Sequence, residues 1–173
     1  MALMIFSADL ERRYTPTDTR ALAVALGRIG PALKYMTWVT NPTLEDVQHP
    51  PTPLFDYHLL GKLSSLRSLS ATCTDVDPAL FRLLPAALVH LELHSFEEPG
   101  VYGISDRILV ALRDPFINFG ELKMLVVHDE LEWWGQDNID TLERACRLRD
   151  IAFEFIEDEE VRARLIAWSR SAR

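Results

Sequence analysis

The sequence predicts an α/β fold in which about five parallel strands form one face of a solenoid and helices form the other. The main observation is a repeated Leu-x-x-Leu-x-Leu pattern, clearest in the stretch 88–93, Leu-Val-His-Leu-Glu-Leu. Weaker copies begin at Leu33, Leu66, Leu122 and Leu148. A helix-forming stretch precedes each copy, as a parallel sheet with helical crossovers requires. Units that repeat in this way stack on their neighbours and share one core.

Each copy has the alternation of a strand with one buried face. Leu91 and Leu93 point to one side, whereas His90, Glu92 and His94 point to the other. We therefore expect the leucines to build the core and the alternate side chains to form a polar surface.

Turn and capping signals divide the chain into helices between these strands. Gly and Pro end helices, and Ser or Asp begins them. Helices are predicted between Thr15 and Ile29, Leu54 and Leu63, Asp77 and Pro85, Ser105 and Asp114, Ile139 and Cys146, and Asp158 and Trp168.

Three segments follow from this pattern. Residues 1–19 are an N-terminal cap or extension, with an apolar strand or helix at its start. Residues 20–156 form the repeat array, and residues 157–173 form a C-terminal capping helix. Four prolines between Pro42 and Pro53 predict a surface loop, which is either a tolerated insertion or a binding loop.

Composition excludes several classes of protein. The 173 residues are 48% apolar and 25% charged, which is typical of a globular protein. No apolar run approaches the roughly 20 residues of a membrane span. The net charge is −8, so we expect neither nucleic acid nor an anionic membrane as a partner. Residues 97–173 hold 17 of the 26 acidic side chains, either as a solubilising face or as a surface for a basic protein.

The two cysteines, Cys73 and Cys146, have no metal-type or disulfide-type spacing. Two buried thiols in a reducing compartment are therefore expected, which places the protein in the cytoplasm or nucleus.

The stretches 66–69, 88–93 and 122–127 resemble leucine-rich repeats. Their irregular spacing, with Gly30-Pro31-Ala32-Leu33 leading into a strand, is similar to the degenerate repeats of fungal F-box-like proteins. This resemblance implies a protein-recognition module that binds the substrate of a ubiquitin ligase adaptor.

The polar surface supplies the candidate site. We expect it to bind a protein partner, with two tryptophans at its rim and no catalysis, cofactor or resident metal. The predicted partner-binding residues are Tyr35, His90, Glu92, His94, Met124, His128, Trp133 and Trp134.

Two alternatives remain open. If the strands pair in register, His94, His128 and Glu154 share one column, and these are zinc-ligand types. A small α/β enzyme, a hydrolase or transferase, is the alternative function, and it requires a deep pocket at the carboxyl ends of the strands. The sequence contains no nucleophile motif or phosphate-binding loop that would favour the enzyme.

Overall fold

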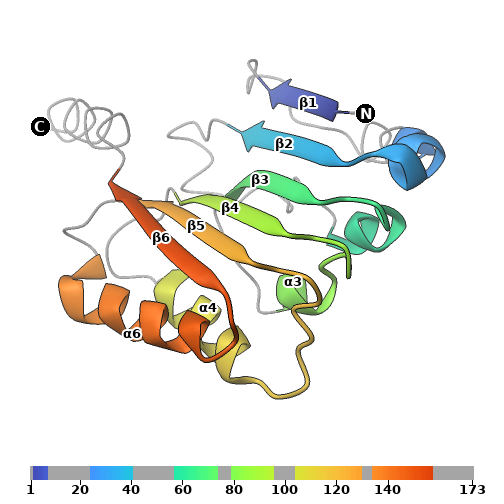
Figure 1. Ribbon diagram of the computed structural model, residues 1–173. Coiled ribbons are helices and arrows are strands. Elements are labelled where there is room, and N and C mark those ends of the chain that lie inside the picture. Colours follow the sequence, from blue (N-terminus) through green and yellow to red (C-terminus); the bar gives the residue numbers. More distant parts are fainter. Residues whose placement is uncertain are drawn as a thin grey trace, which may run out of the picture.

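The computed structural model describes residues 2–7, 24–40, 57–73, 79–95, 104–129 and 134–157. Six strands form one sheet in chain order, and every neighbouring pair is parallel (Figure 1). They are β1 (Ala2–Ser7), β2 (Tyr35–Thr40), β3 (Ser68–Cys73), β4 (His90–Ser95), β5 (Met124–Asp129) and β6 (Ala152–Glu157). The sheet is open, with β1 and β6 at its edges. The predicted α/β class with parallel strands is confirmed, and β1 adds one strand to the expected number.

Helical segments connect the strands. They comprise residues 24–29, η1 (Gly30–Ala32), η2 (Tyr57–Lys62), α3 (Ala79–Arg82), α4 (Ile104–Arg113) and α6 (Gln136–Arg147). Right-handed crossovers between consecutive parallel strands place all connections on the same side of a sheet. Figure 1 shows α3, α4 and α6 on one side of the sheet, as the sequence predicts. The predicted loop 42–53 and the predicted helix between Asp158 and Trp168 lie outside the described residues.

Four of the predicted copies share one local structure. In each, a leucine two residues before the strand closes a tight turn by donating its N–H to the carbonyl three residues earlier. The bonds are Leu33 to Gly30 (3.1 Å), Leu66 to Leu63 (2.9 Å), Leu88 to Pro85 (2.9 Å) and Leu122 to Phe119 (3.0 Å). These leucines are at most 3% exposed, so each turn anchors the start of its strand in the core.

The fifth copy differs, and its predicted register is wrong by two residues. The N–H of Ile151 binds the carbonyl of Cys146 (3.0 Å), and the N–H of Asp150 binds that of Arg147 (3.1 Å). This pair of bonds is a Schellman motif, in which Asp150 takes the left-handed conformation with φ 59°. The turn uses residues 148–150, so β6 begins only at Ala152 and Leu148 is 85% exposed.

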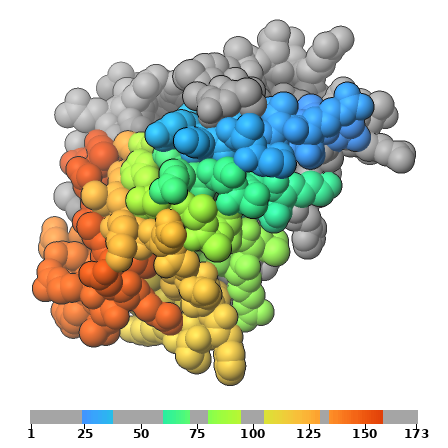
Figure 2. Space-filling model, turned by 45° about the vertical axis from the view of Figure 1, so that its right-hand side comes forward, coloured from blue at the N-terminus to red at the C-terminus, as the bar shows by residue number. Residues whose placement is uncertain are grey.

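The core lies between the sheet and the helices. Met36, Leu69, Leu91 and Leu125 form one row across the strands, and the rows pack against helix residues such as Ile108. Figure 2 shows the successive units as neighbouring bands in chain order. α6 packs against both α4 and β6 and buries Cys146. Burial raises the pKa of the Cys146 thiol to about 12. The prediction of a buried free thiol is therefore confirmed for this cysteine.

No helix among the described residues is both long enough and apolar enough to cross a membrane.

Candidate functional site

The second face of the sheet, turned away from α3, α4 and α6, carries the predicted polar surface. We call it the distal face. It contains the side chains that alternate with the core residues along β2 to β6. Register places them in three rows: Tyr35, Ser68, His90, Met124 and Ala152, then Thr37, Ser70, Glu92, Val126 and Glu154, and finally His94, His128 and Ile156.

The first row begins with an exposed aromatic side chain, since Tyr35 is 54% exposed. Two strands away, Nδ1 of His90 lies 3.2 Å from the hydroxyl of Ser68, which holds the imidazole along the row. Met124 is half-buried beside His90. The row therefore combines an exposed aromatic ring, an oriented imidazole and a flexible apolar side chain.

Glu92, His94 and His128 converge at the centre of the sheet. Nε2 of His128 lies 2.7 Å from Oε1 of Glu92, and Nε2 of His94 lies 3.8 Å from the same oxygen. The two imidazole rings stack with their centroids 4.2 Å apart and their planes 19° from parallel. The side chains of these residues are 15–27% exposed, so the cluster is partly dehydrated but still reached by solvent.

Ser70 completes this cluster from β3. Its hydroxyl lies 3.0 Å from Nε2 of His94 and also hydrogen-bonds the Glu92 carboxylate. An ionised carboxylate only accepts, so Ser70 donates to Glu92 and accepts from His94, and His128 donates from Nε2 to Glu92. In this network both imidazoles carry a proton on Nε2.

Several effects act on the pKa of the Glu92 carboxyl. Partial burial is the largest, and it opposes ionisation. The hydrogen bonds from Ser70 and His128, together with the charges of His94 and His128, outweigh it and hold the pKa of Glu92 below its ordinary value. Glu92 is therefore a carboxylate beside two imidazoles.

The predicted column of His94, His128 and Glu154 is confirmed for the two histidines but not for the glutamate. His94 and His128 are direct partners across β4 and β5. The predicted position of Glu154 is wrong. The turn at residues 148–150 shifts β6, so Ile156 pairs with His128 and Glu154 pairs with Val126. Glu92 takes the place of the predicted carboxylate.

Of the two tryptophans predicted at the rim of the site, the structure describes Trp134, and it does not lie at an exposed rim. Trp134 is only 5% exposed. Its ring packs 5.2 Å from that of Phe155, and its Nε1 donates to the buried carboxylate of Asp129 at 2.6 Å. Trp134 therefore caps the core, and the expectation that it forms an exposed rim is wrong. Trp133 lies outside the described residues.

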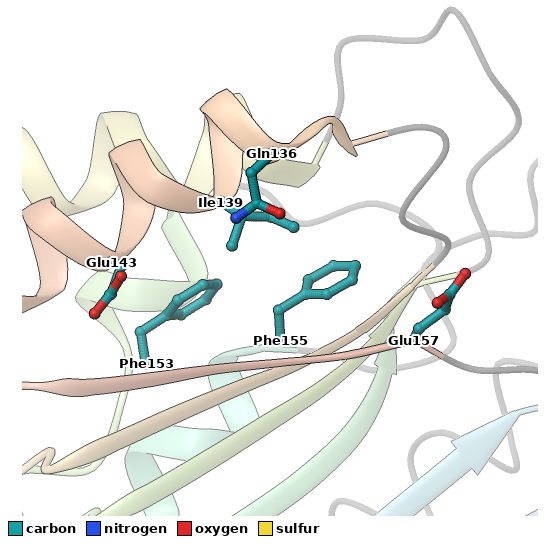
Figure 3. A pocket seen from close by; sticks show the side chains of 6 residues that line it. All are labelled: Gln136, Ile139, Glu143, Phe153, Phe155 and Glu157. Carbon is teal, nitrogen blue, oxygen red and sulfur yellow. The ribbon is translucent and has the colours of Figure 1, made fainter.

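Two adjoining cavities lie away from the predicted site residues, between α6 and β6. The first, about 360 Å³, is lined by Phe153 and Phe155 of β6, which face Ile139 of α6 (Figure 3). The second, about 510 Å³, shares Phe153 and extends along charged side chains. None of the seven predicted site residues that the structure describes lines either cavity.

Ser68 and Ser70 were not among the predicted site residues, although each binds a histidine of the distal face. The signal for them was their place in the same rows, since side chains opposite each other on neighbouring strands lie within contact distance.

Comparison with known proteins found no matching family model, no matching curated protein and no matching solved structure.

Proposed function

We propose that this protein is a non-catalytic protein-recognition module that binds its partner through the distal face. The observation that carries the proposal is the continuous set of side chains across β2 to β6. It begins with the exposed ring of Tyr35, and most of its members are partly or fully exposed, whereas Ser70 (9% exposed) and Val126 (5% exposed) are buried within it. With strands about 4.8 Å apart, five strands span about 19 Å. That width accommodates the central group of residues that carries most of the binding energy in a protein interface.

The composition of the face fits this role. Aromatic and methionine side chains are enriched at interfaces, and Tyr35 and Met124 supply them. His90 is held in place by Ser68, so less side-chain freedom is lost when it contacts a partner.

The alternative, a small α/β enzyme, expects polar groups from several strands to converge in a pocket. The cavity in Figure 3 is lined by one strand and one helix, with two phenylalanines in its wall. That lining offers no set of groups from several strands, so it gives the enzyme no support.

The finer proposal is that the chain is a leucine-rich-repeat solenoid that binds substrates for an F-box-type ubiquitin ligase adaptor in the cytoplasm or nucleus. It rests on the resemblance of the repeats. The four turns at Leu33, Leu66, Leu88 and Leu122, which share the same backbone hydrogen bond, support the solenoid part of this proposal.

Affinity capture from a native cell extract tests the recognition function. The bait is the full chain, compared with a variant that carries both Tyr35→Ala and His90→Ala. These side chains lie two strands apart, about 10 Å, so one contact region includes both. Captured proteins are quantified by mass spectrometry, and we expect a set that wild type retains and the double variant loses. Ubiquitin-ligase subunits in that set would support the finer proposal.

Phe116→Ala is the matched control. Phe116 is also an exposed aromatic residue, at 90%, but it follows α4 and is not on the distal face. The control should capture the same set as wild type. Unchanged capture by the double variant, or equal loss with Phe116→Ala, would exclude the distal face as the binding surface.

A further inference from the structure

Two imidazoles and one carboxylate lie close together on the neighbouring strands β4 and β5. Glu92 and His94 lie two residues apart on β4, so they share a face, and His128 is the direct partner of His94 on β5. One ligand-type atom from each side chain can be chosen so that all lie within 4.8 Å of one another.

We propose that Glu92, His94 and His128 bind a divalent first-row transition-metal ion of the Zn²⁺ type. Imidazole nitrogen and carboxylate oxygen are the donors that such ions take together in proteins. Three protein ligands leave a coordination position for water or for a group from a partner. The exposed fraction of the cluster gives that position access to solvent. This proposal goes beyond the recognition function and does not depend on it.

The distances fit an ion of this size. Bonds of about 2.0–2.1 Å in tetrahedral geometry place two ligand atoms about 3.3 Å apart. Without an ion, Oε1 of Glu92 lies 2.7 Å from Nε2 of His128 and 3.8 Å from Nε2 of His94. Each of these two separations therefore changes by about 0.5 Å, a shift of the size that side-chain rotation produces.

Binding also changes the hydrogen bonds. The ion needs the lone pair of Nε2 on each imidazole, so the proton that each ring holds there moves to Nδ1. The nearly parallel rings also have to turn apart, so that both lone pairs point at one ion. Ser70 then keeps its bond to Glu92 and orients the carboxylate, as outer residues do around metal sites.

The backbone around the cluster is held firmly. β4 pairs with β3 on one side and β5 on the other, and β5 in turn pairs with β6. The backbone positions of the three ligands are therefore fixed before the ion arrives, so the rearrangement on binding is confined to the side chains.

Zinc titration of the full-length protein tests the proposal. Zn²⁺ is added to chelator-treated protein in competition with a chromophoric chelator, and the affinity is read from the chelator's absorbance. We expect His94→Ala, His128→Ala and Glu92→Gln each to weaken zinc binding by at least about tenfold. Circular dichroism checks that each variant is folded, and Glu92→Gln, which keeps the side-chain shape, serves if an alanine variant is not.

His90→Ala is the matched control, because His90 lies on the same face of the same strand and outside the cluster. It should bind zinc as wild type does, even where it weakens partner capture, so the two proposals fail separately. A second readout is the imidazole NMR spectrum, in which zinc should shift the signals of His94 and His128 but not those of His90.

Two results would overturn the proposal. One is zinc affinity that stays unchanged in the cluster variants. The other is zinc binding that is lost in a variant carrying His49→Ala and His58→Ala but kept in His94→Ala, which would assign the ion to the two remaining histidines of the chain.

Discussion

Replacing Leu91 by alanine should lower the free energy of unfolding by more than replacing an exposed leucine does. Leu91 is 0% exposed, in the middle of the sheet. Loss of about three methylene equivalents at about 0.8 kcal/mol each gives about 2.4 kcal/mol for transfer alone. β3 and β5 hold Leu69 and Leu125 beside it, so the neighbours have little room to fill the space. The cavity term raises the expected loss to about 3–5 kcal/mol.

Leu148→Ala is the matched comparison, because the sequence pattern assigns Leu148 to the same kind of core position. The structure leaves Leu148 85% exposed after α6, so the expected change is within about 0.5 kcal/mol. Urea unfolding of both variants gives the midpoint and the slope, and an unchanged slope shows that the comparison is valid. Equal losses would mean that Leu148 is a core residue and that β6 begins two residues earlier.

Three further predictions concern the turns and the buried thiol. Gly120→Ala should cost more than about 2 kcal/mol, because φ is +57° and the new Cβ would lie 2.5 Å from the Ala86 carbonyl oxygen; Gly27→Ala, with nothing within 4 Å, should leave the urea midpoint unchanged or higher. Asp150→Val should lower the melting temperature and Asp150→Gly should not, because a β-branched residue is strained at φ 59°; equal melting temperatures would contradict the turn. Cys146, whose thiol pKa is raised to about 12, should resist iodoacetamide at pH 8 until urea unfolds the chain, and stability should fall as pH rises from about 9 towards 12. Peptide mass spectrometry reads this thiol separately, and rapid labelling of the folded protein would show that it is accessible.

The positions of β2 to β5 follow from the sequence because one local interaction sets each of them. A leucine that closes a tight turn is also a residue that must be buried, so the pattern of apolar residues and the backbone turn agree. Leu33, Leu66, Leu88 and Leu122 all lie two residues before a strand. The alternation of polar residues then assigns Tyr35 and the later members of its row to the distal face.

The start of β6 does not follow from the sequence for a physical reason. The left-handed residue that ends a helix is usually a glycine, which can be recognised in the sequence, but here it is Asp150. The stretch from Leu148 to Phe153 also has leucine-repeat spacing, so hydrophobic pattern and helix capping conflict. The carboxyl-terminal turn of α6 prevails because its two bonds close the helix after Arg147 and bring Ile151, which is 3% exposed, into the core.

The turn at residues 148–150 also determines which carboxylate lies beside His94 and His128. A strand that began two residues earlier would put Glu154 beside His128, but the observed register puts Ile156 there. Glu92 instead reaches His128 diagonally, since its direct partner is Val126 and a long side chain spans the diagonal between strands. The proposed ligand set thus lies on two of the inner strands, β4 and β5, and includes no residue of the edge strand β6. Asp150→Val, which strains the turn before β6, should therefore lower stability while leaving zinc affinity unchanged, and a parallel loss of zinc would show that β6 supplies a ligand.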